Sequence, residues 1–196
     1  MLPAFQSSTG TIYRASALLR QQPLSSSTEL DQLLPAGTAQ GSLVDLHADE
    51  AVGALALALK IAAEQQRRFP TRSVVLVDTT ADLYPPGLLP LGIDLSRTFV
   101  LRPSERDALP CLDEALRSKS VAASVGRIKC IGGTQSHRLR IAAQAGNGIG
   151  ILVRPLAERG EISGASLRLH VSRGTDGTLH FEPLRLRGAI ALSRPS

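Results

Sequence analysis

Tryptophan is absent from this sequence, and aromatic residues make up only 3% of its 196 positions. Proteins that hold single-stranded nucleic acid by base stacking need exposed aromatic rings, so this scarcity weakens that class of function. The core must be built from aliphatic side chains, which supply most of the 43% of residues that are hydrophobic. A chain of this length is expected to form one domain with a full core.

Cysteine is also scarce, and Cys111 and Cys130 stand in no metal-binding or CxxC spacing. We expect both to be reduced thiols. The sequence has no apolar run of the roughly 18 residues that suggest a membrane-spanning helix. Its first residues lack the basic stretch and apolar core of a secretion signal. The expectation is a cytoplasmic protein without membrane association.

Acidic residues are missing from one long stretch, between Glu114 and Glu158, although the net charge of the whole chain is only +5. The same stretch contains seven basic residues: Arg117, Lys119, Arg127, Lys129, Arg138, Arg140 and Arg154. This bias suits a DNA phosphate backbone or an acidic partner surface. A solvated basic face with no ligand is the alternative.

The apolar patterns that are present alternate between strand and helix. Residues 1–30 are weakly patterned, and we expect a partly flexible segment with a short helix over 12–20. From residue 31 to about 190 we expect one α/β domain, with a mostly parallel sheet flanked by helices and a C-terminal antiparallel hairpin. The expected strands are 42–46, 73–78, 98–101, 121–131 and 149–153, then a hairpin from Ser166; the expected helices are 49–66, about 108–117 and 135–145.

The stretch from Ser42 to Leu55 has the layout of a phosphate-binding loop without its chemistry. Such a loop reads G-x-x-x-x-G-K-[ST]: its glycines bring backbone N–H groups to the phosphates, and its lysine holds the outer ones. Here His47 stands at the first glycine position, Asp49 follows, and Val52-Gly53-Ala54 lies near where Gly-Lys-Ser/Thr belongs. No lysine occurs before Lys60. The pattern indicates an NTPase-like frame with a degenerate loop.

Several short sequence segments, taken in their order and spacing, resemble those of the RecA-like superfamily. Within it they resemble the ImuA-type proteins of bacterial inducible mutagenesis, which are related to SulA. They lie within residues 25–188 and are 29–37 (ELDQLLPAG), 83–86 (LYPP), 91–97 (LGIDLSR), 101–103 (LRP), 114–118 (EALRS), 138–146 (RLRIAAQAG) and 186–188 (LRG). The resemblance implies a RecA-like core.

A RecA-type ATPase also needs a glutamate after its second strand and a magnesium-holding aspartate at the end of a later one. Here Thr79 and Thr80 stand near the first position, with Asp82 as a displaced substitute. Lys129 stands near the second, where a positive charge opposes metal binding. We therefore expect no catalytic residue, no metal and no cofactor. Weak nucleotide binding through backbone N–H groups and a residual ATPase stay open as alternatives.

The resemblance implies an accessory role in DNA-damage tolerance, within the SOS response and translesion synthesis. Its implied partners are an ImuB-like Y-family protein, an alternative polymerase alpha subunit and RecA. The equivalents of the two loops that carry DNA in RecA would be 132–135 and 155–164, both short. A basic DNA-binding module built on residues 117–154 is the second hypothesis.

Other chemistry-bearing residues give weaker signals. A single histidine at the strand–helix turn, His47, is most simply structural. Asp49, Asp78 and Asp82 could approach one another at the carboxyl edge of the sheet. The other histidines, His137, His170 and His180, have no zinc spacing, and Ser124 and Ser136 have no G-x-S-x-G context.

Overall fold

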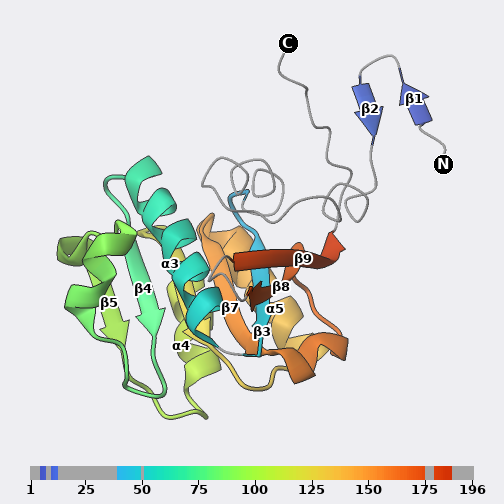
Figure 1. The fold of residues 1–196 in the computed structure, drawn as a ribbon. Helices are drawn as coiled ribbons and strands as arrows, with labels where there is room; N and C mark the ends of the chain where they lie inside the picture. Colours follow the sequence, from blue (N-terminus) through green and yellow to red (C-terminus); the bar gives the residue numbers. More distant parts are fainter. Residues whose placement is uncertain (1–4, 8–9, 13–38, 50, 175–178, 187–196) are drawn as a thin grey trace.

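The structure is a computed structural model that describes residues 5–7, 10–12, 39–49, 51–174 and 179–186. Its main feature is a seven-stranded sheet with strand order β5-β4-β6-β7-β3-β8-β9 (Figure 1). All neighbouring strands are parallel except β8 and β9, which form an antiparallel pair. The predicted fold class, a mostly parallel α/β sheet with a C-terminal antiparallel hairpin, is confirmed.

The elements follow the predicted alternation. The strands of the sheet are β3 (Leu43–Ala48), β4 (Ser73–Val77), β5 (Thr98–Leu101), β6 (Val121–Arg127), β7 (Ile149–Pro155), β8 (Leu167–Arg173) and β9 (Leu179–Leu186). The α-helices are α3 (Ala51–Arg68), α4 (Ala108–Arg117) and α5 (Gly133–Gly146), with three short 3-10 helices η1 (Pro85–Leu91), η2 (Leu95–Arg97) and η3 (Leu156–Gly160).

Near the N-terminus, β1 (Phe5–Ser7) pairs with β2 (Gly10–Ile12) in a separate two-stranded antiparallel sheet, which the sequence did not predict. Ile12, the first residue of the helix expected over 12–20, lies in β2. The rest of that helix, and most of the segment expected to be partly flexible, lie outside the described residues.

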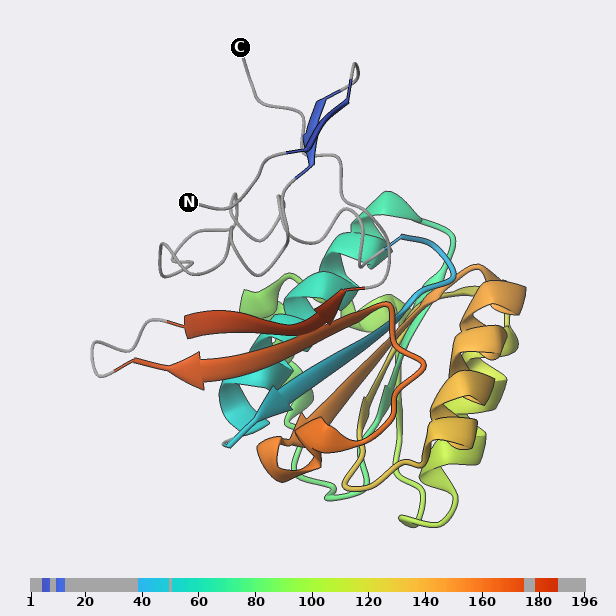
Figure 2. The same cartoon turned by 90° about the vertical axis from the view of Figure 1, so that its right-hand side faces the viewer.

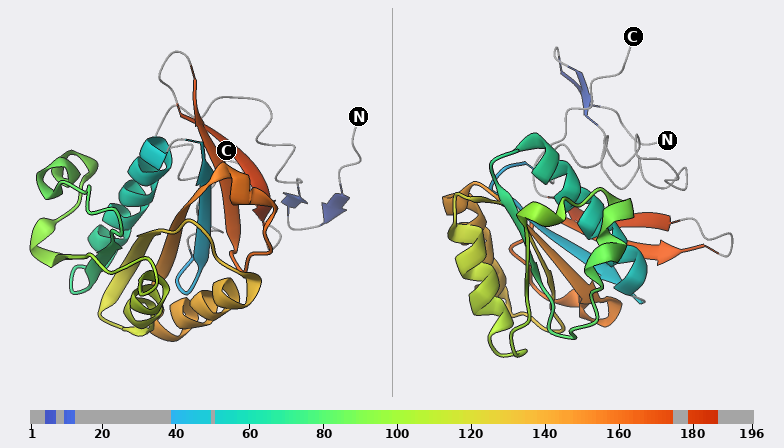
Figure 3. Two further views of the ribbon diagram at one scale, coloured as in Figure 1. Left: turned by 90° about the horizontal axis from the view of Figure 1, so that it is seen from below. Right: turned by 90° about the vertical axis from the view of Figure 1, so that its left-hand side faces the viewer.

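Two hydrophobic clusters lie on opposite faces of the sheet. In β3, Val44 and Leu46 belong to the cluster under α3, whereas Leu43 belongs to the cluster under α4 and α5. Figures 2 and 3 show this three-layer arrangement, with α3 on one side and α4 and α5 on the other. Period-2 alternation in the strands therefore sends apolar side chains into two separate cores. In the part of the chain that is described, no helix is long and apolar enough to cross a bilayer.

The strand β6 is shorter than the predicted 121–131 and more buried than its mixed polarity suggested. Its small residues allow helices to approach closely: a Cβ at Gly126 would lie 2.5 Å from Cδ1 of Leu112 in α4. The same closeness joins α4 to α5, because a Cβ at Gly146 would lie 2.0 Å from the backbone oxygen of Leu116. Small residues here serve helix packing rather than loop flexibility.

Candidate functional site

The connection between β3 and α3, where a phosphate-binding loop would lie, is short. The strand ends at Ala48 and the helix begins at Ala51, which leaves only Asp49 and Glu50 between them. A working loop needs the four residues between its two glycines to wrap the phosphates. In this chain His47, at the first glycine position, lies within the strand, and Gly53 lies within the first turn of the helix.

The residues near the expected Gly-Lys-Ser/Thr are packed into the protein. Ala54 is fully buried in the core under α3. A Cβ at Gly53 would lie 2.9 Å from Cδ2 of Leu179, so this glycine lets α3 pass close to β9. Val52 lies in the same first turn. The sequence motif therefore corresponds to the packed start of a helix.

His47 is fully buried, and its ring belongs to a polar cluster rather than to an open turn. The expectation that His47 lies in the turn is wrong, because β3 extends to Ala48. A guanidinium can only donate, so the 3.1 Å contact from Arg168 Nη2 makes His47 Nε2 the acceptor. The proton then lies on Nδ1, which faces the carbonyl oxygen of Pro155 at 3.3 Å. Both ring nitrogens of His47 therefore have partners within the protein.

The centre of this cluster is Asp45, whose side chain is fully buried on the same face of β3. Its Oδ2 accepts a 2.6 Å hydrogen bond from Ser163 and lies 3.5 Å from both Arg154 Nη1 and Arg168 Nε. Burial by itself would raise the pKa of Asp45, but the Ser163 hydroxyl and the charge of Arg154 lower it below its ordinary value. Asp45 is therefore ionised in the folded protein.

Sequence reasoning missed both Asp45 and Arg168. Each stands among apolar residues of a strand, at positions that normally face solvent in an alternating pattern. Strands β3 and β8 lie in the interior of the sheet, and both faces of an interior strand are covered. Recognising them as interior strands would therefore have predicted that Asp45 and Arg168 are buried.

At the carboxyl ends of β4 and β6, Arg127 and Asp82 form an ion pair. Arg127, the last residue of β6, donates to Asp82 and, at 2.9 Å, to the hydroxyl of Thr80. The hydrogen bond from Arg127 lowers the pKa of Asp82. Asp78 is fully buried and accepts from Thr80 and from the backbone N–H of Leu83.

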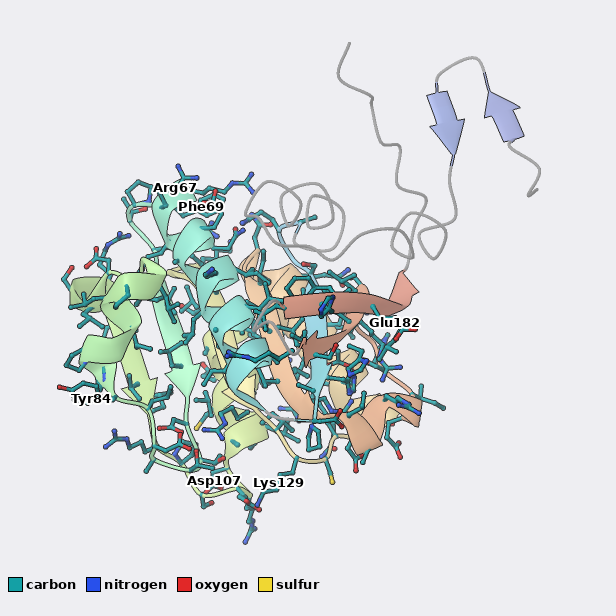
Figure 4. All side chains as sticks on the ribbon, viewed as in Figure 1. Arg67, Phe69, Tyr84, Asp107, Lys129 and Glu182 are labelled. Atoms are coloured by element: carbon teal, nitrogen blue, oxygen red, sulfur yellow. The ribbon has the colours of Figure 1, made fainter. Side chains whose placement is uncertain are left out.

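The aspartates considered as a divalent-ion site do not gather into one. Over the described ranges, no group of three acidic, histidine or cysteine side chains could hold a metal ion. The later strand ends at Arg127 rather than near Lys129, so the residue at the strand end is the arginine. Lys129 pairs instead with Glu105, and Figure 4 shows Lys129 and Asp107 at the same end of the molecule.

The basic residues of 117–154 do not form one free surface. Arg117 and Arg138 both bind Asp113, with N···O distances of 3.0 Å. These two hydrogen-bond donors lower the pKa of Asp113 despite its burial, which acts in the opposite direction. Lys119 is exposed, with no ion pair to any described residue, and Arg140 contacts His137 at 3.3 Å.

Arg154 requires a correction. The sequence placed it among residues available to DNA or a partner, but it is only 1% exposed. Its guanidinium lies between Asp45 and Glu158, at 3.5 and 3.7 Å. Arg154 is buried because its face of β7 is covered by the segment that follows the strand. That segment includes η3, which carries Glu158.

One exposed apolar surface lies at the free edge of the sheet, on β5. Phe99 and Leu101 are 58% and 38% exposed, and in register they adjoin Val75 and Val77 on the α4 side of β4. Strand β5 pairs only with β4, so its outer edge has no strand partner among the described residues. Sequence reasoning identified the strand but not its edge position, since strand order is set by tertiary contacts.

The order and direction of the strands define the class of fold, a RecA-like α/β domain. A RadB recombinase structure has the same fold, with a TM-score of 0.62 and 21% identity over 81% of this chain and 87% of that one. A SulA structure from Pseudomonas aeruginosa reaches a TM-score of 0.49, at 22% identity over 57% of this chain and 97% of that one. No family model matches the sequence.

Within that class, the sequence is similar to "Protein ImuA" from two strains of Caulobacter vibrioides. The identity is 36% over 90 residues, which is 44% of this chain. The match spans 37% of the length of those curated relatives. Together with the RecA-like fold, this similarity supports a RecA-like protein of the ImuA type, as the resemblance in the sequence indicated.

Proposed function

We propose that this protein is a non-catalytic RecA-like accessory factor in bacterial DNA-damage tolerance that acts by binding other proteins. The observation that carries the proposal is the two-residue connection between β3 and α3. It offers no loop whose backbone N–H groups could surround a triphosphate. The similarity to ImuA supplies the biological setting, which includes SOS mutagenesis and translesion synthesis.

The rest of the carboxyl edge supports the same proposal. An arginine–aspartate pair fills the space at the ends of β4 and β6, and it places a cation where an ATPase would keep a magnesium ligand. At the motif's lysine position, a side chain on Gly53 would meet Leu179, and Ala54 at the Ser/Thr position is fully buried. Nucleotide binding would require a longer connection between β3 and α3, no cation at the end of β6, and open space at the start of α3.

By resemblance, the partners are an ImuB-like Y-family protein, an alternative polymerase alpha subunit and RecA. The edge of β5 is the surface best suited to such a contact. Its unpaired backbone groups fit an extended peptide segment, and Phe99 and Leu101 supply apolar anchors. Arg102 and Arg106 are exposed just beyond the strand, so the matching segment carries two alternating apolar residues followed by an acidic one.

Direct DNA binding by the segment 117–154 is the second hypothesis, and the ion pairs weaken it. Four of its seven cations form ion pairs with acidic side chains and a fifth, Arg154, is buried. Affinity for DNA that rests on free cations falls steeply with salt. Titration of a fluorescent single strand at 50 and 200 mM salt separates the hypotheses: submicromolar binding that collapses at high salt would favour the DNA-binding module.

The proposal itself is tested by reconstitution. The purified chain is mixed in turn with an ImuB-like protein, the polymerase alpha subunit and RecA, and complexes are separated by size-exclusion chromatography with light scattering. We expect a stable complex with at least one of the three in the absence of nucleotide. Failure of all three, with or without DNA, would contradict the proposal.

A further inference from the structure

The edge strand β5 is covered on one face and open on the other. On the α3 side, Val100 packs against the hydrophobic cluster that also contains Leu88 of η1. On the α4 side, Phe99 and Leu101 are exposed. Parallel sheets are normally covered on both faces. Among the described residues, that cover is missing on the α4 side of β5.

One side of α4 borders this uncovered part of the sheet. Helix α4 packs mainly on β4 and β6, and α5 packs on β7 and β3, so the side of α4 that faces away from α5 faces β5. Asp113 marks the α5 side, because it binds Arg138. Cys111 and Ala115 lie two residues before and after Asp113, which at 3.6 residues per turn places both on the opposite side of the helix. Both are half-buried against the cluster under α4 and α5.

The open face therefore consists of four side chains that are all at least partly exposed: Phe99 and Leu101 on β5, and Cys111 and Ala115 on α4. Figure 3 (right) views the molecule from the β5 edge, with α4 and α5 on one side of the sheet and α3 on the other. A strand added to the edge of β5 would leave these side chains exposed, because it lies in the plane of the sheet. An element that covers them must lie on top of the sheet.

The dimensions of the sheet indicate that this element is a helix. Neighbouring strands lie about 4.8 Å apart, and a helix with its side chains is about 10 Å across, so one helix covers about two strands. On this side of the sheet, α4 and α5 cover the four strands β4, β6, β7 and β3 in this way. Strand β5 and one strand added to its edge would give the width for one further helix.

The connection between β5 and α4 closes one end of the open face, and its charge is set by Arg106. This arginine is exposed and forms no ion pair with any described residue. The other charges of the connection are compensated. Arg102 lies 4.0 Å from the carboxylate of Asp78, and Glu105 forms an ion pair. Asp107 stands at the N-terminus of α4, where a carboxylate offsets the helix dipole. A segment on the open face would therefore gain from an acidic residue near Arg106.

We propose that a partner protein covers the open face with an amphipathic helix that lies beside α4, above β5 and the strand paired with its edge. This inference rests on the proposed function and specifies the element of the partner that is bound. Apolar side chains three and four residues apart on the helix pack against Phe99 and Leu101, and an acidic residue near one end reaches Arg106. The partner is thus recognised by a strand and a helix instead of by a strand alone.

The two native cysteines test this inference in the full chain without any substitution. Cys111 belongs to the open face, whereas Cys130 is exposed beyond the end of β6 and serves as the reference. Labelling with N-ethylmaleimide, read by mass spectrometry, gives the rate at each thiol in the free chain and in its complex with the ImuB-like protein. We expect labelling of Cys111 to be at least tenfold slower in the complex, and labelling of Cys130 to change less than twofold.

Light scattering on the same samples separates the possible failures. A complex that leaves the labelling rate of Cys111 unchanged would overturn this inference and leave the proposed function intact. If no complex forms with the ImuB-like protein, the polymerase alpha subunit or RecA, both are contradicted. Resistance of Cys111 to labelling in the free chain would also overturn the inference, because a second copy, seen as a dimer, or a segment of this chain would then cover the face.

A matched pair of alanine substitutions tests the same face by affinity. Ala115→Arg places a long charged side chain on the open face, whereas Ala145→Arg places it on the exposed surface of α5. We expect Ala115→Arg to weaken the complex at least tenfold and Ala145→Arg to leave it unchanged, with circular dichroism confirming that both variants fold. The same affinity for both variants would overturn the inference.

Discussion

Gly53 in α3 and Leu179 in β9 are in such close contact that a Cβ at position 53 would lie 2.9 Å from the Leu179 side chain. The start of the first long helix is thus packed against the last strand of the sheet. In a phosphate-binding protein this part of the chain surrounds a ligand. Here the glycine permits close packing between two elements that lie far apart in the sequence.

Introducing a lysine into the first turn of α3 should destabilise the protein. Ala54 is fully buried, so Ala54→Lys places an ammonium group in the core, and we expect a loss of about 3 kcal/mol or more in the free energy of unfolding. Urea denaturation measures it. Ala145→Lys is the matched control, because Ala145 is exposed on α5. Equal stability of the two variants would mean that the start of α3 is open.

Gly146→Ala should be costly although alanine favours helices. The added Cβ would meet the backbone oxygen of Leu116 at 2.0 Å, and a backbone atom cannot rotate away. Displacing α4 from α5 should cost about 2 kcal/mol after the helix-propensity gain of about 1 kcal/mol. Thermal unfolding of Gly160→Ala is the control, since a Cβ there would meet no atom within 4 Å. A Gly146→Ala protein as stable as that control would argue against the close helix packing.

The Asp113 pairs should give a defined dependence of stability on pH. Arg138 and Arg117 lower the pKa of Asp113 below its ordinary value of 3.8. A lowered pKa in the folded state adds stability that is fully present above the unfolded pKa and is lost as the pH falls through the folded value. Urea unfolding between pH 7 and pH 2.5 should therefore show the wild type to be more stable at neutral pH. The free energies of unfolding of wild type and Asp113→Asn should converge only at acid pH. A constant difference at every pH would contradict this assignment.

The exposed edge of β5 should bind the partner protein, and its exposed side chains should add little to the stability of the fold. We expect the double variant Phe99→Glu and Leu101→Glu to fold normally and to weaken complex formation at least tenfold, because it removes both apolar anchors and opposes an acidic segment. Fluorescence anisotropy with the labelled partner measures the affinity. Ile141→Glu is the control, as Ile141 is 44% exposed on α5. Equal affinities of the two variants would place the contact elsewhere.

The order of the elements could be predicted because their apolar periods are strong. The continuous β-branched run at 73–77 became β4, and α4 begins at Ala108 with Pro110 in its first turn, where a missing N–H is harmless. The parallel sheet followed from the alternation of strands and helices. The length of β6 was harder to predict, because alanine, serine and glycine give a weak strand signal even when they are fully buried.

The buried cluster could not be predicted for a different reason. Asp45 meets Ser163 across a sequence separation of 118 residues, and His47 meets Arg168 across 121. Local patterns contain no information on such pairs, so Arg154 was interpreted as a surface cation. The absence of acidic residues between Glu114 and Glu158 predicted a free basic surface for the same reason. The counter-ions of that stretch come from other parts of the chain.

ATP hydrolysis by the full chain tests the central claim most directly. The measurement is phosphate release with Mg²⁺ and single-stranded DNA, in parallel for the wild type, Asp78→Ala and Asp82→Ala. A RecA-like scaffold with only Asp49 and Glu50 between β3 and α3 should release no phosphate above the buffer rate in any of the three. Steady turnover by the wild type that is lost in either variant would contradict the account.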